Sequence, residues 1–105
     1  DYDPIAKRAI IVDDEVATGG TLCEAAVFLK EQGATMVTAA FTHPVLSGEA
    51  VQRLDGSCIG EIVFTDTIPL MGKASPKFKV LGVAELCAKA IRRIHDGESI
   101  SELFR

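Results

Sequence analysis

The chain has 105 residues, 48% of them hydrophobic, and a formal net charge of −4. That length suits one small domain with a hydrophobic core, while the acidic balance and the lack of a basic stripe argue against binding to nucleic acid or anionic membranes. Because no apolar run approaches the roughly 20 residues of a membrane span, and no signal peptide is evident, we expect a cytoplasmic protein without a membrane anchor.

Strand-like and helix-like segments alternate in the first part of the chain. Ala9–Val12 is wholly apolar, as expected of a strand that is covered on both faces. Apolar residues recur at helical spacing over residues 22–29 and predict a helix that ends near Gly33. Met36–Thr42 then predicts a second strand.

The same alternation continues in the middle of the chain. Ser47 is predicted to cap a short helix that ends near Gly56. Glu61–Thr65 predicts a third strand, and residues 67–78, which contain prolines and a glycine, predict a loop. Lys79–Val83 follows as a fourth strand.

The last predicted element is a helix with apolar residues between positions 87 and 94, and it ends at Gly97. The alternation predicts an α/β fold with a mostly parallel sheet of about four strands and crossover helices. Because parallel crossovers are right-handed, strands added in one direction place these helices on one face. The last helix could return to the other face but cannot cover all of it, so we expect missing sequence or a partner chain to cover the rest.

Two adjacent carboxylates, Asp13 and Asp14, follow the first predicted strand. The loop after them contains Ala17, Thr18, Gly19, Gly20 and Thr21 and opens the first predicted helix. Carboxylates at a strand end can accept hydrogen bonds from vicinal hydroxyls, and glycines let backbone N–H groups approach an anion at a helix N-terminus. Carboxylates for a ribose beside amides for its phosphate indicate a site for a phosphorylated pentose.

Four segments carry a resemblance to one enzyme family. Residues 9–22 look like the phosphoribosyl-diphosphate (PRPP) loop of the type I phosphoribosyltransferase fold. Thr42–Gly48, Thr65–Pro69 and Ala90–Ser101 resemble, in the same order, the C-terminal part of ribose-phosphate pyrophosphokinase (PRPP synthetase). The likeness extends over nearly the whole chain, which we therefore interpret as a C-terminal phosphoribosyltransferase-like domain, residues 1–105, of a longer protein. The start at Asp1, without an initiator methionine, fits that interpretation.

The resemblance implies roles for the residues of the loop. Asp13 and Asp14 would hold the ribose 2- and 3-hydroxyls and assist a magnesium-bound diphosphate, so Mg²⁺ is the expected cofactor. The small-residue loop would position the phosphate of ribose 5-phosphate. The family often has aspartate where this chain has Ala17, so one carboxylate beside the sugar phosphate is absent here. We expect binding to survive with altered affinity, and no catalytic residue can be named.

The resemblance also implies partners outside this chain. The activity would transfer the diphosphoryl group of ATP to ribose 5-phosphate, which yields PRPP and AMP. ATP would bind through a missing N-terminal half, so the isolated chain should be inactive. Ser99 and Ser101 match a family segment that contributes to a regulatory phosphate or ADP site between subunits, and a homo-oligomer is expected.

Two alternatives stay open at the level of sequence. One is a non-catalytic binder of PRPP or ribose phosphate, or another phosphoribosyltransferase, on the same fold. The other is a response-regulator receiver, because residues 10–15 resemble its magnesium-binding acidic pair and Asp66 ends the third strand as a phosphoacceptor would. Receivers do not need the Thr-Gly-Gly-Thr loop, which argues against them. His43 and Asp66 both follow strand ends, where ligands bind in open α/β sheets, and we expect a structural role for His43 and a supporting polar role for Asp66.

Overall fold

The computed structural model describes residues 8–104, so that Asp1, where the chain begins, lies outside the described part. Four parallel strands form one sheet in the order β1-β2-β3-β4. This arrangement confirms the α/β prediction. The elements are β1 (Arg8–Val16), α1 (Gly20–Glu31), β2 (Met36–Pro44), α2 (Ala50–Asp55), β3 (Glu61–Thr65), β4 (Phe78–Leu81), α3 (Ala84–His95) and a final 3₁₀ turn, η1 (Ser101–Phe104).

The strand order bears on one of the alternatives. In a receiver domain the first strand lies between the second and the third, in the order 2-1-3-4-5. Here β1 pairs with β2 and forms an edge of the sheet. The receiver interpretation is therefore wrong, although the acidic pair resembles the receiver motif.

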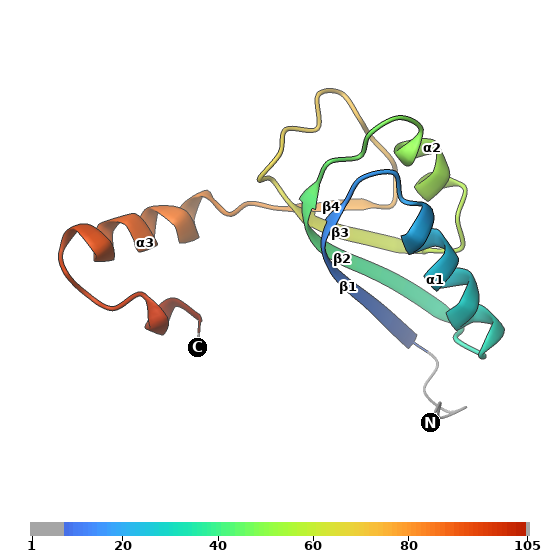
Figure 1. Ribbon diagram of the computed structural model, residues 1–105, viewed down its shortest axis with the longest axis horizontal. Coiled ribbons are helices and arrows are strands. Elements are labelled where there is room, and N and C mark those ends of the chain that lie inside the picture. The colour runs from blue at the N-terminus through green and yellow to red at the C-terminus, as the bar shows by residue number, and fades with distance from the viewer. Residues whose placement is uncertain (1–7, 105) are drawn as a thin grey trace.

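The hydrophobic core lies between the sheet and helices α1 and α2, which cover the same face (Figure 1). Alternate residues of β2 and β3 point into it, so Val37, Ala39, Ile62 and Phe64 are all at most 1% exposed. Phe64 stacks on Phe41 at a ring distance of 5.2 Å, across the β2–β3 pairing. Alternation along the strands thus fixes which face of the sheet meets the helices.

The opposite face of the sheet is largely uncovered. Ile10, Val12 and Leu81 are 68%, 77% and 57% exposed. Helix α3 does not return to this face, since among the described elements it contacts only η1 and it extends away from the carboxyl end of β4 (Figure 1). The expectation of an incompletely covered face agrees with this arrangement, but α3 covers none of it.

Several element boundaries differ from the sequence predictions, among them the end of β2, which lies at Pro44 rather than Thr42. Strand β1 continues through the acidic residues to Val16, because β2 pairs with it as far as Pro44. Pairing with a neighbouring strand outweighs the low strand propensity of aspartate. Ser47 does not cap α2: Glu49 occupies the N-cap position and makes no side-chain cap. Strand β4 ends at Leu81 rather than Val83. None of the helices in residues 8–104 is long and apolar enough to cross a membrane.

Candidate functional site

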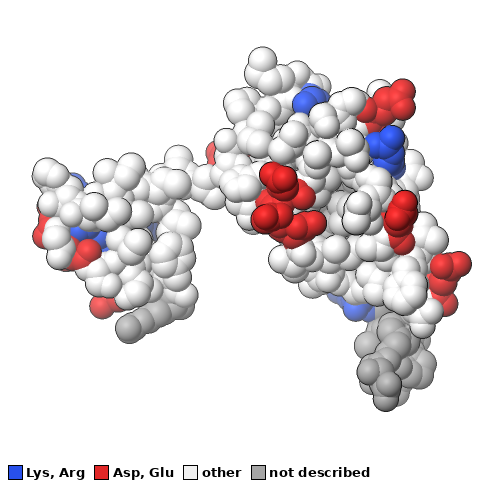
Figure 2. Space-filling model, in the orientation of Figure 1, with Lys and Arg blue, Asp and Glu red and all other residues white. Residues whose placement is uncertain are grey.

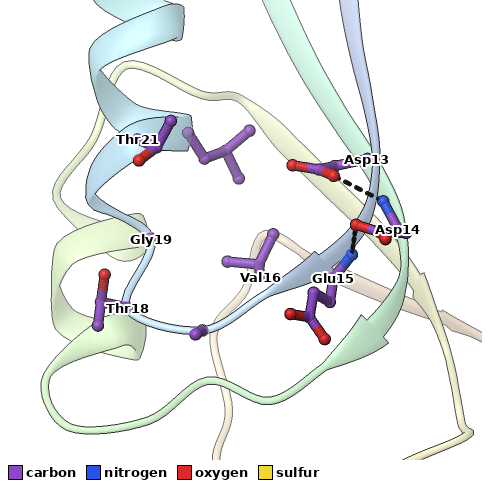
Figure 3. Close-up of a pocket in the computed structure, with 9 residues that line it drawn as sticks. Asp13, Asp14, Glu15, Val16, Thr18, Gly19 and Thr21 are labelled. Atoms are coloured by element: carbon purple, nitrogen blue, oxygen red, sulfur yellow. Dashed lines mark hydrogen bonds between the residues drawn. The ribbon is translucent and has the colours of Figure 1, made fainter.

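A pocket of about 340 Å³ opens where β1 passes into α1. Its walls are the end of the strand, the connecting loop and the first turn of the helix (Figure 3). Six of the seven residues predicted from sequence line this pocket, and Gly20 does not. The six are Asp13, Asp14, Ala17, Thr18, Gly19 and Thr21. Glu15, Val16 and Leu22 also line it and were not predicted, although Glu15 belongs to the same acidic run.

The acidic side of the pocket is exposed and internally hydrogen-bonded. The N–H of Asp14 donates to Asp13 Oδ1 at 2.7 Å, and the N–H of Glu15 donates to Asp14 Oδ1 at 2.8 Å. Hydrogen bonding with the Asp13 side chain and with the Glu15 N–H lowers the pKa of Asp14 below its usual value. Figure 2 shows a cluster of acidic side chains on the face of the molecule toward the viewer. Three consecutive acidic residues, Asp13, Asp14 and Glu15, line the pocket. Carboxylate oxygens of this kind accept hydrogen bonds from hydroxyl groups.

The backbone of the loop is hydrogen-bonded to the segment that joins β2 to α2 and to α2 itself. Leu46 N–H donates to the carbonyl of Val16 at 3.0 Å, and Ser47 N–H donates to the carbonyl of Ala17 at 2.8 Å. Arg53 Nη1, from α2, donates to the carbonyl of Thr18. The carbonyls of Val16, Ala17 and Thr18 therefore face the β2–α2 segment and α2. No pattern in the sequence predicted this anchoring.

This anchoring determines where the loop N–H groups point. In a trans peptide the N–H is antiparallel to the C=O of the same unit, so the N–H groups of Ala17, Thr18 and Gly19 point away from the groups of the β2–α2 segment and of α2 that bind those carbonyls. All three residues line the pocket. Gly19, the N-cap of α1, has φ of +81° and offers no side-chain cap, while Thr18 Oγ1 accepts the N–H of Gly20 at 3.5 Å. The other N–H groups of the first turn add to a surface that suits an anion.

Two residues at the neighbouring strand ends lie outside the pocket lining. His43 Nδ1 is 2.8 Å from Thr67 Oγ1, beyond the end of β3. Asp66 Oδ1 accepts the N–H of Val83 at 2.9 Å, directly before α3. Asp66 therefore fixes the β4–α3 connection, a supporting polar role that is structural.

Ser99 and Ser101 lie on the arm formed by α3 and η1, apart from the pocket. Their hydroxyl oxygens are 2.8 Å apart, and Arg93 Nη1 donates to the carbonyl of Ser99 at 3.1 Å. Arg93 also pairs with Glu102 at 3.5 Å. A regulatory phosphate bound beside Ser99 and Ser101 would thus occupy a different site from a ligand in the pocket.

Comparisons with known proteins agree on one family. Ribose-phosphate pyrophosphokinases of Xylella fastidiosa (strain 9a5c) and Xanthomonas campestris pv. campestris are 55% and 52% identical over 93% and 97% of this chain. The crystal structure of phosphoribosylpyrophosphate synthetase from Mycobacterium smegmatis superposes with a TM-score of 0.83, at 40% identity, over 86% of the chain.

This chain spans about a third of each of these relatives: 31% and 33% of the two enzymes and 30% of the crystallised chain. The sequence profile of the phosphoribosyl synthetase-associated domain matches residues 3–105. The match covers nearly every residue, including the whole pocket. The chain therefore belongs to the phosphoribosyl synthetase-associated domain family.

Proposed function

We propose that this chain is the ribose 5-phosphate and PRPP-binding part of a ribose-phosphate diphosphokinase, which converts ATP and ribose 5-phosphate to PRPP and AMP in nucleotide biosynthesis. The observation that carries the proposal is the pocket itself. One wall supplies carboxylates and the other supplies backbone N–H groups at a helix N-terminus. The relatives are named for this reaction, and they align with the residues that build the pocket.

In this proposal the two walls bind different parts of the sugar phosphate. Asp13 and Asp14 accept hydrogen bonds from the ribose hydroxyls, and the amides of residues 17–21 receive the 5-phosphate. Holding the pentose in a fixed orientation makes attack of its O1 on ATP effectively unimolecular, and positioning is the main contribution of protein to phosphoryl-type transfer.

Magnesium fits this donor set only together with substrate. Among residues 8–104, no group of three or more potential ligand side chains is arranged to hold a metal ion. Mg²⁺ commonly uses one or two carboxylates plus substrate phosphates, and Asp13 and Asp14 offer such oxygens at the pocket rim. The ion would neutralise diphosphate charge when it is bound.

The remaining parts of the reaction belong to a longer protein in this proposal. ATP binds through an N-terminal half, and this chain forms the C-terminal, phosphoribosyltransferase-like domain of a cytoplasmic homo-oligomer. Ser99 and Ser101 contribute to a regulatory phosphate site. The 105-residue chain alone accordingly yields no AMP above background from ATP, magnesium and ribose 5-phosphate.

The binding role can be tested by isothermal titration calorimetry. Replacing Asp13→Asn and Asp14→Asn together should weaken ribose 5-phosphate binding at least about tenfold, because hydrogen bonds to charged groups contribute about 1.5–3 kcal/mol each. Inorganic phosphate binding should not weaken. The control Glu24→Gln with Glu31→Gln removes the same charge from residues of α1 that do not line the pocket. Equal losses in both double variants would contradict the proposal.

Ala17 favours a second candidate, a non-catalytic PRPP-binding regulator. The related enzyme family often carries aspartate there, and Ala17 lines the pocket without offering a carboxylate. The two candidates differ in what precedes Asp1 in the gene. A homologous upstream half with an ATP-binding loop supports the diphosphokinase, whereas a half without one supports the regulator.

A further inference from the structure

A threonine network lies at the carboxyl ends of β2 and β3, beside the pocket. The carbonyl of Thr42 accepts the hydroxyl of Thr65 at 2.7 Å and the hydroxyl of Thr67 at 3.3 Å. The N–H of Thr67 in turn donates to Thr65 Oγ1 at 3.2 Å. A hydroxyl has one proton, and the arrangement that satisfies all of these contacts directs the proton of Thr67 to the Thr42 carbonyl.

The same arrangement of protons assigns one tautomer to the His43 ring. Thr67 Oγ1 lies 2.8 Å from His43 Nδ1 and, with its own proton directed to the Thr42 carbonyl, accepts there. In this arrangement His43 Nδ1 carries a hydrogen. In the neutral imidazole the other nitrogen, Nε2, is then an acceptor.

The ring also has a defined neighbourhood. His43 is exposed, and its register partner on β1 is Glu15, which lines the pocket. Nδ1 is directed to Thr67 on the β3 side, so the Cδ2–Nε2 edge of the ring lies toward β1. When its ring is protonated, His43 contributes to lowering the pKa of Asp14, which agrees with that proximity. His43 thus lies on the strand next to the acidic run, at the edge where open α/β sheets bind ligands.

We propose that His43 is a further binding residue of this site, whose neutral Nε2 accepts a hydrogen bond from a hydroxyl of the bound phosphorylated pentose, with Thr67 holding the ring in the required tautomer. The inference rests on the proposed function, because it extends the same site from β1 to the end of β2. In this proposal the threonine network orients a binding residue in addition to stabilising the local structure.

The first test is long-range ¹H–¹⁵N NMR of the two imidazoles, since the chain contains only two histidines. Without ligand, His43 should show the tautomer with hydrogen on Nδ1. Ribose 5-phosphate should then shift His43 Nε2 but leave His95, on α3, unchanged. The opposite tautomer, or loop amides that shift without His43 Nε2, would overturn this inference while leaving the proposed function intact. If neither shifts, both fail.

Substitutions test the contribution to affinity. Asparagine can reproduce the Nδ1 donor but not the Nε2 acceptor, so His43→Asn should weaken ribose 5-phosphate binding about two- to tenfold, the range for one neutral hydrogen bond. Thr67→Val should cause a similar loss and disturb the tautomer, whereas Thr67→Ser, which keeps the hydroxyl, should restore both. His95→Asn is the matched control. Unchanged affinity in His43→Asn with a native ¹H–¹⁵N spectrum would refute the inference.

Discussion

Gly19 has an unusual backbone conformation that shapes the loop of the pocket. Its φ of +81° lies in the left-handed region, and a Cβ built there would be 3.4 Å from the Leu54 side chain. Gly20, the next residue, begins α1 with ordinary helical geometry, and a Cβ built there would meet only Thr18 Oγ1, at 3.8 Å. The two glycines are adjacent in sequence, but only the first is required by the turn.

Paired alanine substitutions test this distinction. Gly19→Ala should lower the free energy of unfolding by about 1–2 kcal/mol, the cost of a left-handed conformation for an L-residue. Gly20→Ala should leave stability unchanged or raise it by up to about 1 kcal/mol, because alanine is the better helix former. Urea unfolding of both variants measures the difference. Equal effects would show that the loop does not require the conformation of Gly19.

The residues of the site could be predicted only as far as they are close in sequence. The acidic pair and the glycine loop lie within residues 13–21, and all of the predicted residues there except Gly20 line one pocket. Arg53 and Thr67 are far away in the chain. Thr67 lies in the family-like segment Thr65–Pro69, but no sequence pattern predicts the contacts of Arg53 with Thr18 and of Thr67 with His43, because these depend on tertiary packing.

At the scale of elements, hydrophobic periodicity predicted which segments form strands and helices, but it did not predict the direction in which the last helix leaves the sheet. Strand β3 has the predicted bounds, because its alternating burial matches its sequence pattern. The direction of α3 could not be predicted, since it depends on the two residues after β4 and on the hydrogen bond from Val83 N–H to Asp66. Three of its residues, Ile91, Ile94 and Leu86, remain 68%, 66% and 39% exposed.

Helix α3 should therefore be much less stable than the sheet. It has 12 residues and packs only on η1, and isolated helices of that length are marginal in water. Hydrogen exchange of the dilute chain should show rapid exchange in α3 and strong protection in β2, which is paired on both sides. Equal protection of the two elements would mean that α3 is packed against something, in contradiction to an unsupported arm.

For the whole molecule, the uncovered face of the sheet is the main structural consequence of the fold. It exposes large apolar side chains from strands at both edges, Ile10 on β1 and Leu81 on β4. Exposed apolar surface of this kind usually marks an interaction site. The longer relatives contain additional sequence that could provide a cover, since this chain spans about a third of them.

The isolated chain should consequently self-associate through this face. Ile10→Lys should reduce association, because a charge would have to be buried in any contact there. Val27→Lys is the matched control, since Val27 is 51% exposed but lies on α1. Sedimentation velocity at several concentrations measures both variants. A monomeric parent chain, or equal effects of the two substitutions, would contradict this role of the open face.

The most direct test of the central claim is a map of backbone amide shifts as ribose 5-phosphate is added to the ¹⁵N-labelled chain. The claim is that one pocket joins a hydroxyl-binding acidic pair to a phosphate-binding loop. The map should show the largest saturable shifts at residues 13–21, and inorganic phosphate should reproduce those of residues 17–21 but not those of Asp13 and Asp14. Largest shifts at Ser99–Ser101, or no saturable shift in the loop, would show that the pentose phosphate does not bind where the pocket lies.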